Sequence, residues 1–421
     1  MRITGIYSSL FLFLTAFLSF ELNAKTLTWE QCVNEASQNN AAVKSAYQSW
    51  QASSSQISAT KSAFLPQVSA SFSANYGKNI ALPNSQTEDS YNASVQVSQN
   101  IFNGWADQAR VDQSDATASI AEKSLQITKA QTSYDLKTGY ARLVYAQRAI
   151  RLQESIRGRR KSNLNLVDLR FDNGSENKGS VLLSQAYLDQ ADLSIIQAQN
   201  SIKVANAQLA RALGRDENEI LTVSEAIPTT PIPRNPNFQM IALSTPQRVQ
   251  AVLREKSAES GITLAKAGYF PTLGVSGSYG RQDNVFFPRD DSWSVGVVLS
   301  IPIFNGGRDY YSTQSAISNR SAAGTSREDL DRQLVLNLNT YLSSLIEAQK
   351  SLQVAQSFLK ASQMRAEIGR GRYNNGLLSF DDWDLIETDL INRQQAHIQS
   401  QRDYVIAEAA WENGLGTGSI K

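Results

Sequence analysis

Two periods of hydrophobic and polar residues alternate along the chain, and each predicts a different element. In residues 68–76, and again in residues 91–98, apolar and polar side chains alternate one by one. The pattern returns in residues 273–279 and 293–301. A period of two is typical of a strand with one apolar and one polar face. We therefore expect strands at about residues 67–77, 90–102, 272–281 and 292–304.

Long stretches without proline lie next to the strand pairs and predict helices of unusual length. Residues 104–172 contain no proline, which gives a helix of about 69 residues, or roughly 100 Å at 1.5 Å per residue. A tip turn at 173–179 follows, and a helix of about half that length ends at Leu213. Ahead of the first strand, one continuous helix is expected over residues 27–61, because no residue before Pro66 stops it.

The second half of the chain repeats this plan at a constant spacing. Chance matches would scatter in offset, so the chain is an internal duplication. An offset of 202 residues relates Ile101-Phe102-Asn103-Gly104 to Ile303-Phe304-Asn305-Gly306, Arg170-Phe171-Asp172-Asn173-Gly174 to Arg372-Tyr373-Asn374-Asn375-Gly376, and Leu213-Gly214 to Leu415-Gly416. An offset of 205 relates Phe64-Leu65-Pro66 to Tyr269-Phe270-Pro271. We expect repeats at 25–214 and 247–416, a proline-rich linker at 215–246, a second tip at 374–380 and a C-terminal tail at 417–421.

The composition argues against several classes of function. The formal net charge is +1, so there is no general basic surface for nucleic acid. The single cysteine, Cys32, and the single histidine, His397, exclude a disulfide framework and argue against a His/Cys metal site. The sequence contains no catalytic constellation, and we expect neither an enzyme nor a cofactor.

Residues 1–24 are expected to be a secretory signal peptide. Arg2 provides the positive start, residues 10–20 form the apolar core, and Leu22-Asn23-Ala24 is an acceptable cleavage site. The alternative is a retained N-terminal membrane anchor, although the apolar core is short for a span that needs roughly 20 residues. Cys32 lies too far beyond the cleavage site to be a lipidated first residue.

The four strands have the length and the aromatic ends of transmembrane β-strands. About ten residues are enough for a tilted strand to cross an outer membrane. A soluble sheet is the alternative, but it accounts for neither the aromatic residues nor the long helices. Two girdles are expected, one near the loops and one near the helices: Tyr76, Tyr91, Tyr279 and Trp293, and Phe64, Phe102, Phe270 and Phe304.

Four strands do not close a barrel, and open strand edges in lipid leave backbone groups unpaired. Two copies would give eight strands, a size whose interior is filled by side chains, and three copies would give twelve. The polar faces consist of Ser, Asn and Gly, which suit a water-filled interior, and three copies are favoured. The helices agree with a helical cylinder below the barrel, because a heptad continues through Leu334, Leu338, Tyr341, Leu345, Ala348, Leu352, Ala355 and Leu359.

With these features, the chain resembles the outer-membrane efflux protein family, the TolC-type outer-membrane factors. The order and spacing of the repeated segments carry the resemblance over essentially the whole mature chain. It implies an α+β membrane protein built from a duplicated helix–strand–strand–helix unit. The expected assembly is a homotrimer with a twelve-stranded transmembrane β-barrel in the outer membrane of a Gram-negative bacterium. A long periplasmic α-helical coiled-coil tunnel would continue that barrel.

The resemblance also implies a function and partners. The chain would be the outer-membrane exit duct of a tripartite efflux pump or type I secretion system. Its partners would be a periplasmic adaptor protein, an inner-membrane transporter of the RND, ABC or MFS type, and outer-membrane lipid. Part of the linker would wrap the tunnel as an equatorial belt. A structural or adhesive coiled-coil surface protein is the alternative, but such an anchor needs no second strand pair.

Three aspartates beyond the second tip, Asp381, Asp382 and Asp384, form the sharpest chemical feature. In a trimer they would form a ring of carboxylates that favours cations at the tunnel mouth. The resemblance places Asp382 at a periplasmic constriction, while Leu385 occupies the next family position and is not acidic. The alternative is an acidic helix start stabilised by the helix dipole.

Basic residues and tip turns complete the candidate site. Four arginines near the tips are expected either to tie the tip shut, to meet the adaptor, or to form a solvated basic face: Arg157, Arg160, Arg370 and Arg372. The turn residues Asn173, Gly174, Asn375 and Gly376 tolerate positive φ at helix ends. By resemblance the same turns would contact the adaptor.

Overall fold

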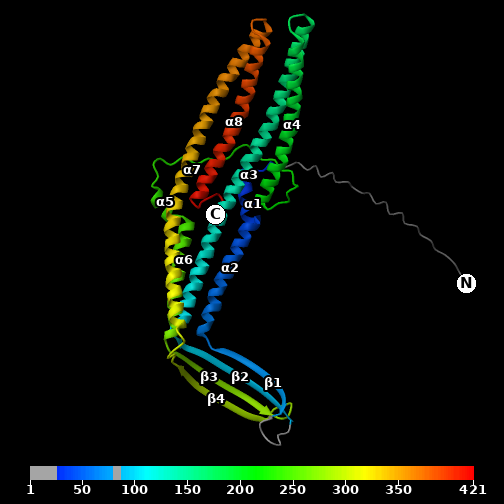
Figure 1. Cartoon of the computed structure of the whole chain (residues 1–421). Helices are drawn as coiled ribbons and strands as arrows, with labels where there is room; N and C mark the ends of the chain where they lie inside the picture. Colours follow the sequence, from blue (N-terminus) through cyan, green and yellow to red (C-terminus); the bar gives the residue numbers. More distant parts are fainter. Residues whose placement is uncertain (1–25, 79–86) are drawn as a thin grey trace, which may run out of the picture.

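The computed structural model describes residues 26–78 and 87–421, and the side chains of 78–88 are left out of this description. The expected signal peptide therefore lies outside the described residues. The molecule is elongated, with a four-stranded sheet at one end, two helical tips at the other, and a belt of irregular chain in between (Figure 1). The two tips belong to the α3–α4 and α7–α8 hairpins (Figure 1).

The sheet joins the two halves of the chain. Its strands are β1 (Gln67–Lys78), β2 (Thr87–Asn103), β3 (Thr272–Asp283) and β4 (Asp290–Ser300), paired antiparallel in that order. Val95 lies opposite Ala70 on one side and Tyr279 on the other, so apolar residues share one face across the strands. Within the described residues, β1 and β4 each have only one strand neighbour, and both edges of the sheet are open.

The expected end of the fourth strand is wrong. β4 ends at Ser300, four residues before the predicted end at 304. Pro302 explains the difference, because proline has no N–H to donate to a strand ladder. Phe304 consequently lies beyond the sheet, in the segment that leads to the next helix.

Two long helices have the same length and the same place in the two repeats. α3 (Ala106–Asp172) and α7 (Arg308–Asn374) each contain 67 residues and begin 202 positions apart. At 1.5 Å per residue, each is about 100 Å long. Each lies beside two shorter helices placed end to end: α2 (Ala41–Lys61) and α4 (Lys178–Leu213) beside α3, and α6 (Pro246–Lys266) and α8 (Phe380–Gly414) beside α7 (Figure 1).

The single helix expected over residues 27–61 is also wrong. The structure divides it into α1 (Trp29–Asn39) and α2, with the break at Asn40. Asn40 has extended backbone angles, and its side-chain Oδ1 accepts hydrogen bonds from the N–H groups of Ala42 and Val43. The side-chain Nδ2 of Asn40 donates to the carbonyl oxygen of Ala212 at 2.9 Å. The break is therefore held by the end of α4, which lies far away in the sequence.

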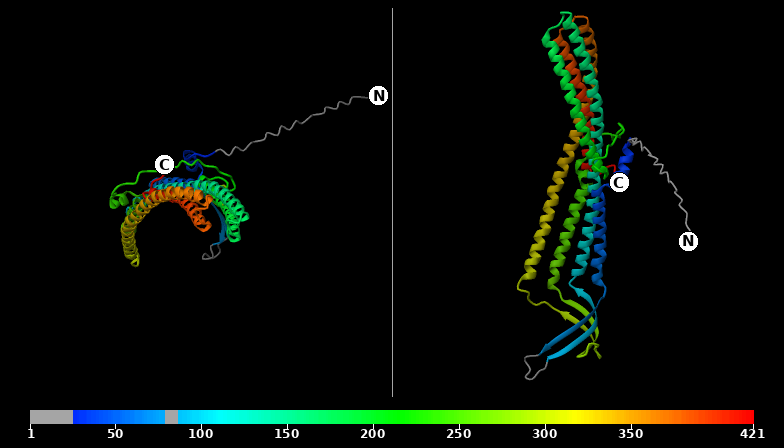
Figure 2. Two further views of the ribbon diagram at one scale, coloured as in Figure 1. Left: turned by 90° about the horizontal axis from the view of Figure 1, so that it is seen from above. Right: turned by 90° about the vertical axis from the view of Figure 1, so that its right-hand side faces the viewer.

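The helices form a curved wall with α1 and the linker on its convex side (Figure 2). α3 lies against both α8 and α6 of the second repeat, whereas α7 lies mainly against helices of its own repeat and the short α5 (Phe238–Ser244), and contacts α3 near the tips. Side chains under α1, α5 and the tips form three separate apolar clusters instead of one core. No helix in the described ranges is both long enough and apolar enough to span a lipid bilayer.

Candidate functional site

The two tips have the same turn. Gly174 and Gly376 have φ values of 70° and 72°, and each N–H bonds back to a carbonyl of the preceding helix. The side chains of Asn173 and Asn375 donate to the carbonyls of Leu169 and Gly371 at 2.7 and 2.9 Å. These contacts satisfy carbonyl groups that a helix end leaves free. The four predicted turn residues thus have a structural role, and their contact with an adaptor stays a prediction.

An aromatic cluster holds the two tips together. The rings of Tyr373 and Trp383 stack with centroids 4.2 Å apart, and both side chains are buried. Arg170 of α3 lies over the Tyr373 ring at 4.6 Å and donates to the Tyr373 carbonyl oxygen at 2.7 Å. The Tyr373 hydroxyl donates to Glu176 across the tips at 3.2 Å. Burial and the neighbouring Glu176 carboxylate raise the pKa of Tyr373 to about 12, so the hydroxyl stays a hydrogen-bond donor at physiological pH.

The three predicted gate aspartates do not share one environment. Asp381 and Asp382 are exposed in the first turn of α8, where Ser379 caps the helix and donates to Asp382 Oδ2 at 2.7 Å. Asp384 instead pairs with Arg160 of α3 at 2.8 Å, and both side chains are nearly buried. Both expected alternatives for Asp381 and Asp382 fit this position, since they lie at a helix start and are open to solvent. Their role in a carboxylate ring stays a prediction.

Two of the four predicted arginines bind buried or nearly buried carboxylates on another helix. Arg160 of α3 binds Asp384 and Thr388 of α8 and lies over the ring of Tyr187 of α4 at 4.3 Å. The pKa of Tyr187 is raised, mainly because its hydroxyl is hydrogen-bonded to Asp384. Arg370 of α7 binds the buried Glu387 of α8 at 2.7 Å. Both ties lie within one protomer and cross between helices.

The other two predicted arginines are open to water. Arg157 pairs with Asp192, but both side chains are nearly half exposed, and such a pair contributes little to stability. In the described part of the chain, Arg372 has no ion pair and no side-chain hydrogen bond. Arg159, a further basic residue near the first tip, donates to Gln394 of α8 at 2.7 Å. Burial is the main cause that lowers the pKa of Arg159.

A second set of ties fixes the belt against the wall. Lys137 of α3 lies 3.2 Å from Glu408 and 3.1 Å from Glu412, and the side chains of Lys137 and Glu408 are only 4% and 1% exposed. Glu408 also accepts hydrogen bonds from the backbone and side chain of Thr230 in the linker. The linker residue Glu225 binds Arg148 at 2.7 Å. The hydrogen bond from Arg148 is the main cause that lowers the Glu225 pKa. The sequence carries no sign of this cluster, because its members come from distant segments.

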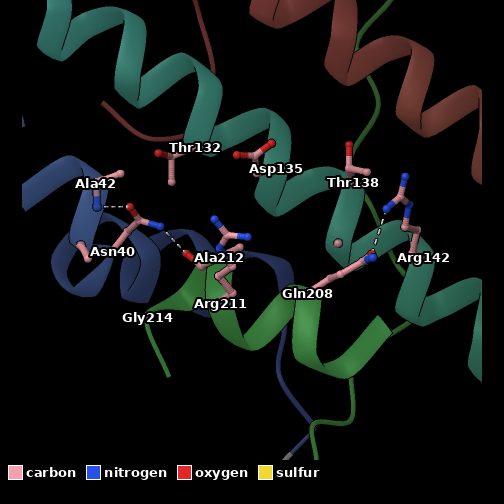
Figure 3. A pocket seen from close by; sticks show the side chains of 12 residues that line it. Asn40, Ala42, Thr132, Asp135, Thr138, Arg142, Gln208, Arg211, Ala212 and Gly214 are labelled. Atoms are coloured by element: carbon pink, nitrogen blue, oxygen red, sulfur yellow. Dashed lines mark hydrogen bonds between the residues drawn. The ribbon is translucent and has the colours of Figure 1, made fainter. Parts of the chain in front are cut away.

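A cavity of about 530 Å³ lies where the end of α4 meets the start of α2 (Figure 3). Asn40 bridges the two helices there, and Arg142 donates to Gln208 at 2.9 Å on the other side of the cavity (Figure 3). Gly139 of α3 lines the cavity, and a Cβ at this residue would lie 3.4 Å from the Cα atom of Leu209 in α4.

The remaining titratable candidates are not assembled into a reactive site. Cys32 is fully buried, and burial raises its pKa to about 11. Burial also lowers the pKa of His397, whose ring nitrogen Nε2 lies 3.1 Å from the Gln401 amide. Over residues 26–78 and 87–421, no group of three His, Cys, Asp or Glu side chains is placed to hold a metal ion.

The aromatic residues predicted as girdles lie toward the two ends of the strands. Tyr76, Tyr279 and Trp293 are exposed at the loop end of the sheet. Tyr91 is half-buried there and packs edge-on against Phe286, with centroids 5.5 Å apart. At the helix end Phe102 packs edge-on against Trp105. Their contact with lipid stays a prediction.

Comparison with known proteins identifies the family. The family described as "Outer membrane efflux protein" matches residues 32–215 and 238–417, most of both repeats. The outer membrane efflux protein BepC of Brucella suis is 20% identical over 387 residues, which cover 91% of this chain and 84% of BepC. The outer membrane protein TolC of Escherichia coli is 22% identical over 377 residues, covering 86% and 76%.

A solved structure shows the same fold. The structure of CusC, a protein that forms a transmembrane channel, superimposes with a TM-score of 0.84 over 92% of both chains at 17% identity. These matches confirm the predicted resemblance, the predicted function as an outer-membrane efflux channel and the predicted outer-membrane location. The chain belongs to the outer membrane efflux protein family.

Proposed function

We propose that three copies of the chain close into one duct, with a twelve-stranded β-barrel in the outer membrane and a helical tunnel in the periplasm. The open sheet is the observation that supports this proposal. β1 and β4 have free edges in the described residues, and the sheet continues into a helical wall that is also curved and open. Free strand edges are not tolerated in lipid, so further copies must pair them. The Ser-rich face suits a water-filled interior.

The two repeats, 25–214 and 247–416, contribute equivalent parts of this duct. Residues 215–246 form the equatorial belt, and the Lys137–Glu408–Glu412 cluster fixes that belt to the wall. The duct conducts cargo passively and catalyses no reaction. Its energy comes from an inner-membrane transporter, linked to it by a periplasmic adaptor that contacts the tip turns. A tripartite efflux pump or type I secretion system is the assembly that fits these parts.

The helical tips form the periplasmic entrance. Asp381 and Asp382 are the exposed carboxylates there, and in a trimer they surround the mouth and favour cations. Arg160–Asp384 and Arg370–Glu387 fix α8 against α3 and α7, so the entrance is rigid until those ties break.

The first test is the native mass, in mild detergent, of the protein extracted from the outer-membrane fraction. A trimer after subtraction of the detergent belt supports the closed duct. A monomer that stays soluble without detergent contradicts it, because the four strands would then be an ordinary sheet.

The second test is ion selectivity in planar bilayers. Replacing Asp381 and Asp382 with Asn removes the exposed carboxylates at the mouth, so cation selectivity should fall. Glu217→Gln, an exposed acid in the belt, is the matched control and should leave selectivity unchanged. Unchanged selectivity in the double aspartate variant would remove both residues from the entrance.

A further inference from the structure

A cavity of about 350 Å³ lies near the tips, between helices from both repeats. Arg159 and Asn163 of α3, Arg370 of α7 and Trp383 of α8 line it, and we call it the tip cavity. α8 lies against both α3 and α7, so it forms the floor between them. In the described residues, the lining of the tip cavity includes two arginines and no carboxylate.

Several hydrogen-bond donors that line the tip cavity have no acceptor among the described residues. The Nε atoms of Arg159 and Arg370 and the indole nitrogen of Trp383 are buried and without a partner. Asn163 is only 9% exposed, and within the described chain its side-chain amide makes no hydrogen bond. Buried donors in folded proteins are nearly always paired. Unpaired donors that gather around one cavity therefore point to a ligand that accepts hydrogen bonds.

The positive charge around the tip cavity exceeds the negative charge. Arg160 pairs with Asp384 at 2.8 Å, and Arg370 pairs with Glu387 at 2.7 Å. Arg159 donates to the neutral amide of a glutamine, and in the described residues it has no ion pair. Two of three neighbouring arginines are thus neutralised, and the third keeps its full charge.

The surroundings of Arg159 disfavour that charge. Burial is the main cause that lowers the pKa of Arg159, and Glu387 opposes this effect. The positive charges of Arg370 and Arg160 lower the pKa further. An anion beside the guanidinium would offset both the burial and the repulsion, because an opposite charge stabilises the charged form.

We propose that the tip cavity binds a small oxyanion of the phosphate class, held by Arg159 and Arg370 and by the neutral donors of Asn163 and Trp383. The planar fork of an arginine matches the oxygens of a phosphate. A tetrahedral oxyanion presents oxygens in every direction, which suits donors that come from three helices, whereas a carboxylate presents two oxygens in one plane. All four residues belong to one chain, so the site does not depend on the proposed trimer.

The source of the oxyanion is the solution around the tips and not a lipid headgroup. Arg159 lies roughly 80 Å along α3 from the first residue of that helix, Ala106. The sheet lies beyond that first residue, at the opposite end of the molecule from the tips (Figure 1). A lipid that surrounds the sheet is therefore too far away to place its phosphate in the tip cavity.

Binding of the oxyanion would join the two repeats near the entrance. Arg159 belongs to α3 of the first repeat and Arg370 to α7 of the second, and their like charges repel each other. An oxyanion between them replaces this repulsion by charge-assisted hydrogen bonds to both helices. Phosphate would therefore stabilise the arrangement of α3, α7 and α8 described above.

Calorimetric titration of the full-length protein in detergent with inorganic phosphate, at pH 7 and constant ionic strength in chloride, tests the site. We expect saturable binding that Arg159→Gln weakens about tenfold or more, because hydrogen bonds to charged groups are the strong ones. The matched control is Arg157→Gln, which removes an exposed arginine paired with Asp192 and should leave binding unchanged. Equal weakening in both variants, or no saturable binding to the unchanged protein, would overturn the proposal.

Thermal unfolding separates a loss of binding from a loss of structure. Without phosphate, Arg159→Gln should not lower the unfolding temperature, since it removes a charge that has no acidic partner. Added phosphate should raise the unfolding temperature of the unchanged protein and of Arg157→Gln, because a ligand stabilises the state that binds it. The same rise in Arg159→Gln would contradict the site. Trp383→Phe keeps an aromatic ring, removes only the donor, and should also weaken phosphate binding.

A nearby acid provides a change in the opposite direction. Glu367 is exposed and lines the adjacent cavity with Arg159 and Arg370, and in the described residues it forms no ion pair with either. Glu367→Gln should strengthen phosphate binding, because a negative charge close to an anion repels it. Unchanged or weaker binding would contradict the proposed location. Acetate should bind more weakly than phosphate, and equal binding would overturn the choice of a tetrahedral oxyanion.

Discussion

The two repeats place different residues at the same helical positions, and the difference changes how each junction is packed. In the first repeat Gly139 of α3 and Ala212 of α4 line an open cavity. The offset relates them to Tyr341 of α7 and Gly414 of α8. There the Tyr341 ring fills the space so fully that a Cβ on Gly414 would lie 2.6 Å from its Cδ2 atom. The duplication preserves the backbone, while the large side chain occurs in one repeat only.

The belt anchors differ in the same way. Asn206 of α4 accepts the N–H of the linker residue Leu221 at 3.3 Å, and its repeat equivalent, Glu408 of α8, accepts Thr230. Of these two linker contacts, the one made by a carboxylate, Glu408, is the one that has a neighbouring cation, Lys137 of α3, to neutralise it. The equivalent of Lys137 is Asn339, which is exposed on α7. The linker is therefore held by the carboxylate of Glu408 on α8 and by the neutral amide of Asn206 on α4.

The largest effect is expected from removing that buried cation. Lys137→Met leaves the buried Glu408 carboxylate without its counter-charge, and breaking a buried pair from one side costs about 3 kcal/mol or more. The midpoint of urea unfolding, followed by helix circular dichroism, should fall accordingly. Asn339→Met, at the equivalent position of the second repeat, is the control and should change the midpoint little. Equal losses in both variants would show that the repeats do not differ here.

A smaller loss of stability is expected when Gly414, at the junction of the second repeat, is replaced by alanine, the residue at the equivalent position 212 of the first repeat. Gly414→Ala places a methyl group against the Tyr341 ring, and overpacking of this kind costs about 2 kcal/mol. In a Tyr341→Ala background the same change should cost almost nothing, because the ring is gone. A double-mutant cycle on unfolding midpoints measures this coupling. Additive costs would mean that the ring moves aside without strain.

The period of the sequence predicted the elements, but the contacts between distant elements set the details. Long proline-free stretches and one-by-one alternation are local signals, so they gave the long helices and the strand pairs. The early end of β4 was also readable, because Pro302 lies inside the expected strand. The break at Asn40 was harder, since it depends on the carbonyl of Ala212.

The site shows the same limit more strongly. Asp381, Asp382 and Asp384 look alike in sequence, yet only Asp384 faces Arg160. That pairing depends on how α3 and α8 lie beside each other, which no local pattern encodes. The positive φ predicted at the tip turns is found at Gly174 and Gly376, whereas Asn173 and Asn375 have φ values of -88° and -87° and bond to helix carbonyls through their side chains.

A modest gain is expected from filling the first junction. Gly139→Ala adds a methyl group whose nearest neighbour is Leu209 Cα at 3.4 Å, an ordinary contact distance. Alanine is better than glycine inside a helix by about 0.5–1 kcal/mol. The unfolding midpoint should therefore rise, opposite in sign to Gly414→Ala. A lower midpoint would show that the cavity must stay open for α2, α3 and α4 to meet.

The smallest effect concerns the pH dependence of stability, and it distinguishes α8 from its equivalent in the first repeat, α4. Burial is the main cause that lowers the pKa of His397 on α8, and the nearby Arg148 lowers it further. The unfolded chain then binds a proton more readily than the folded one, so stability should fall as the pH drops below the ordinary histidine pKa of about 6.5. The repeat equivalent of His397 is Ile195, which does not titrate. His397→Ile should flatten the unfolding midpoint between about pH 7 and pH 5 relative to the unchanged protein. An identical pH dependence in both would assign the loss to other groups, because removal of the only histidine would then have changed nothing.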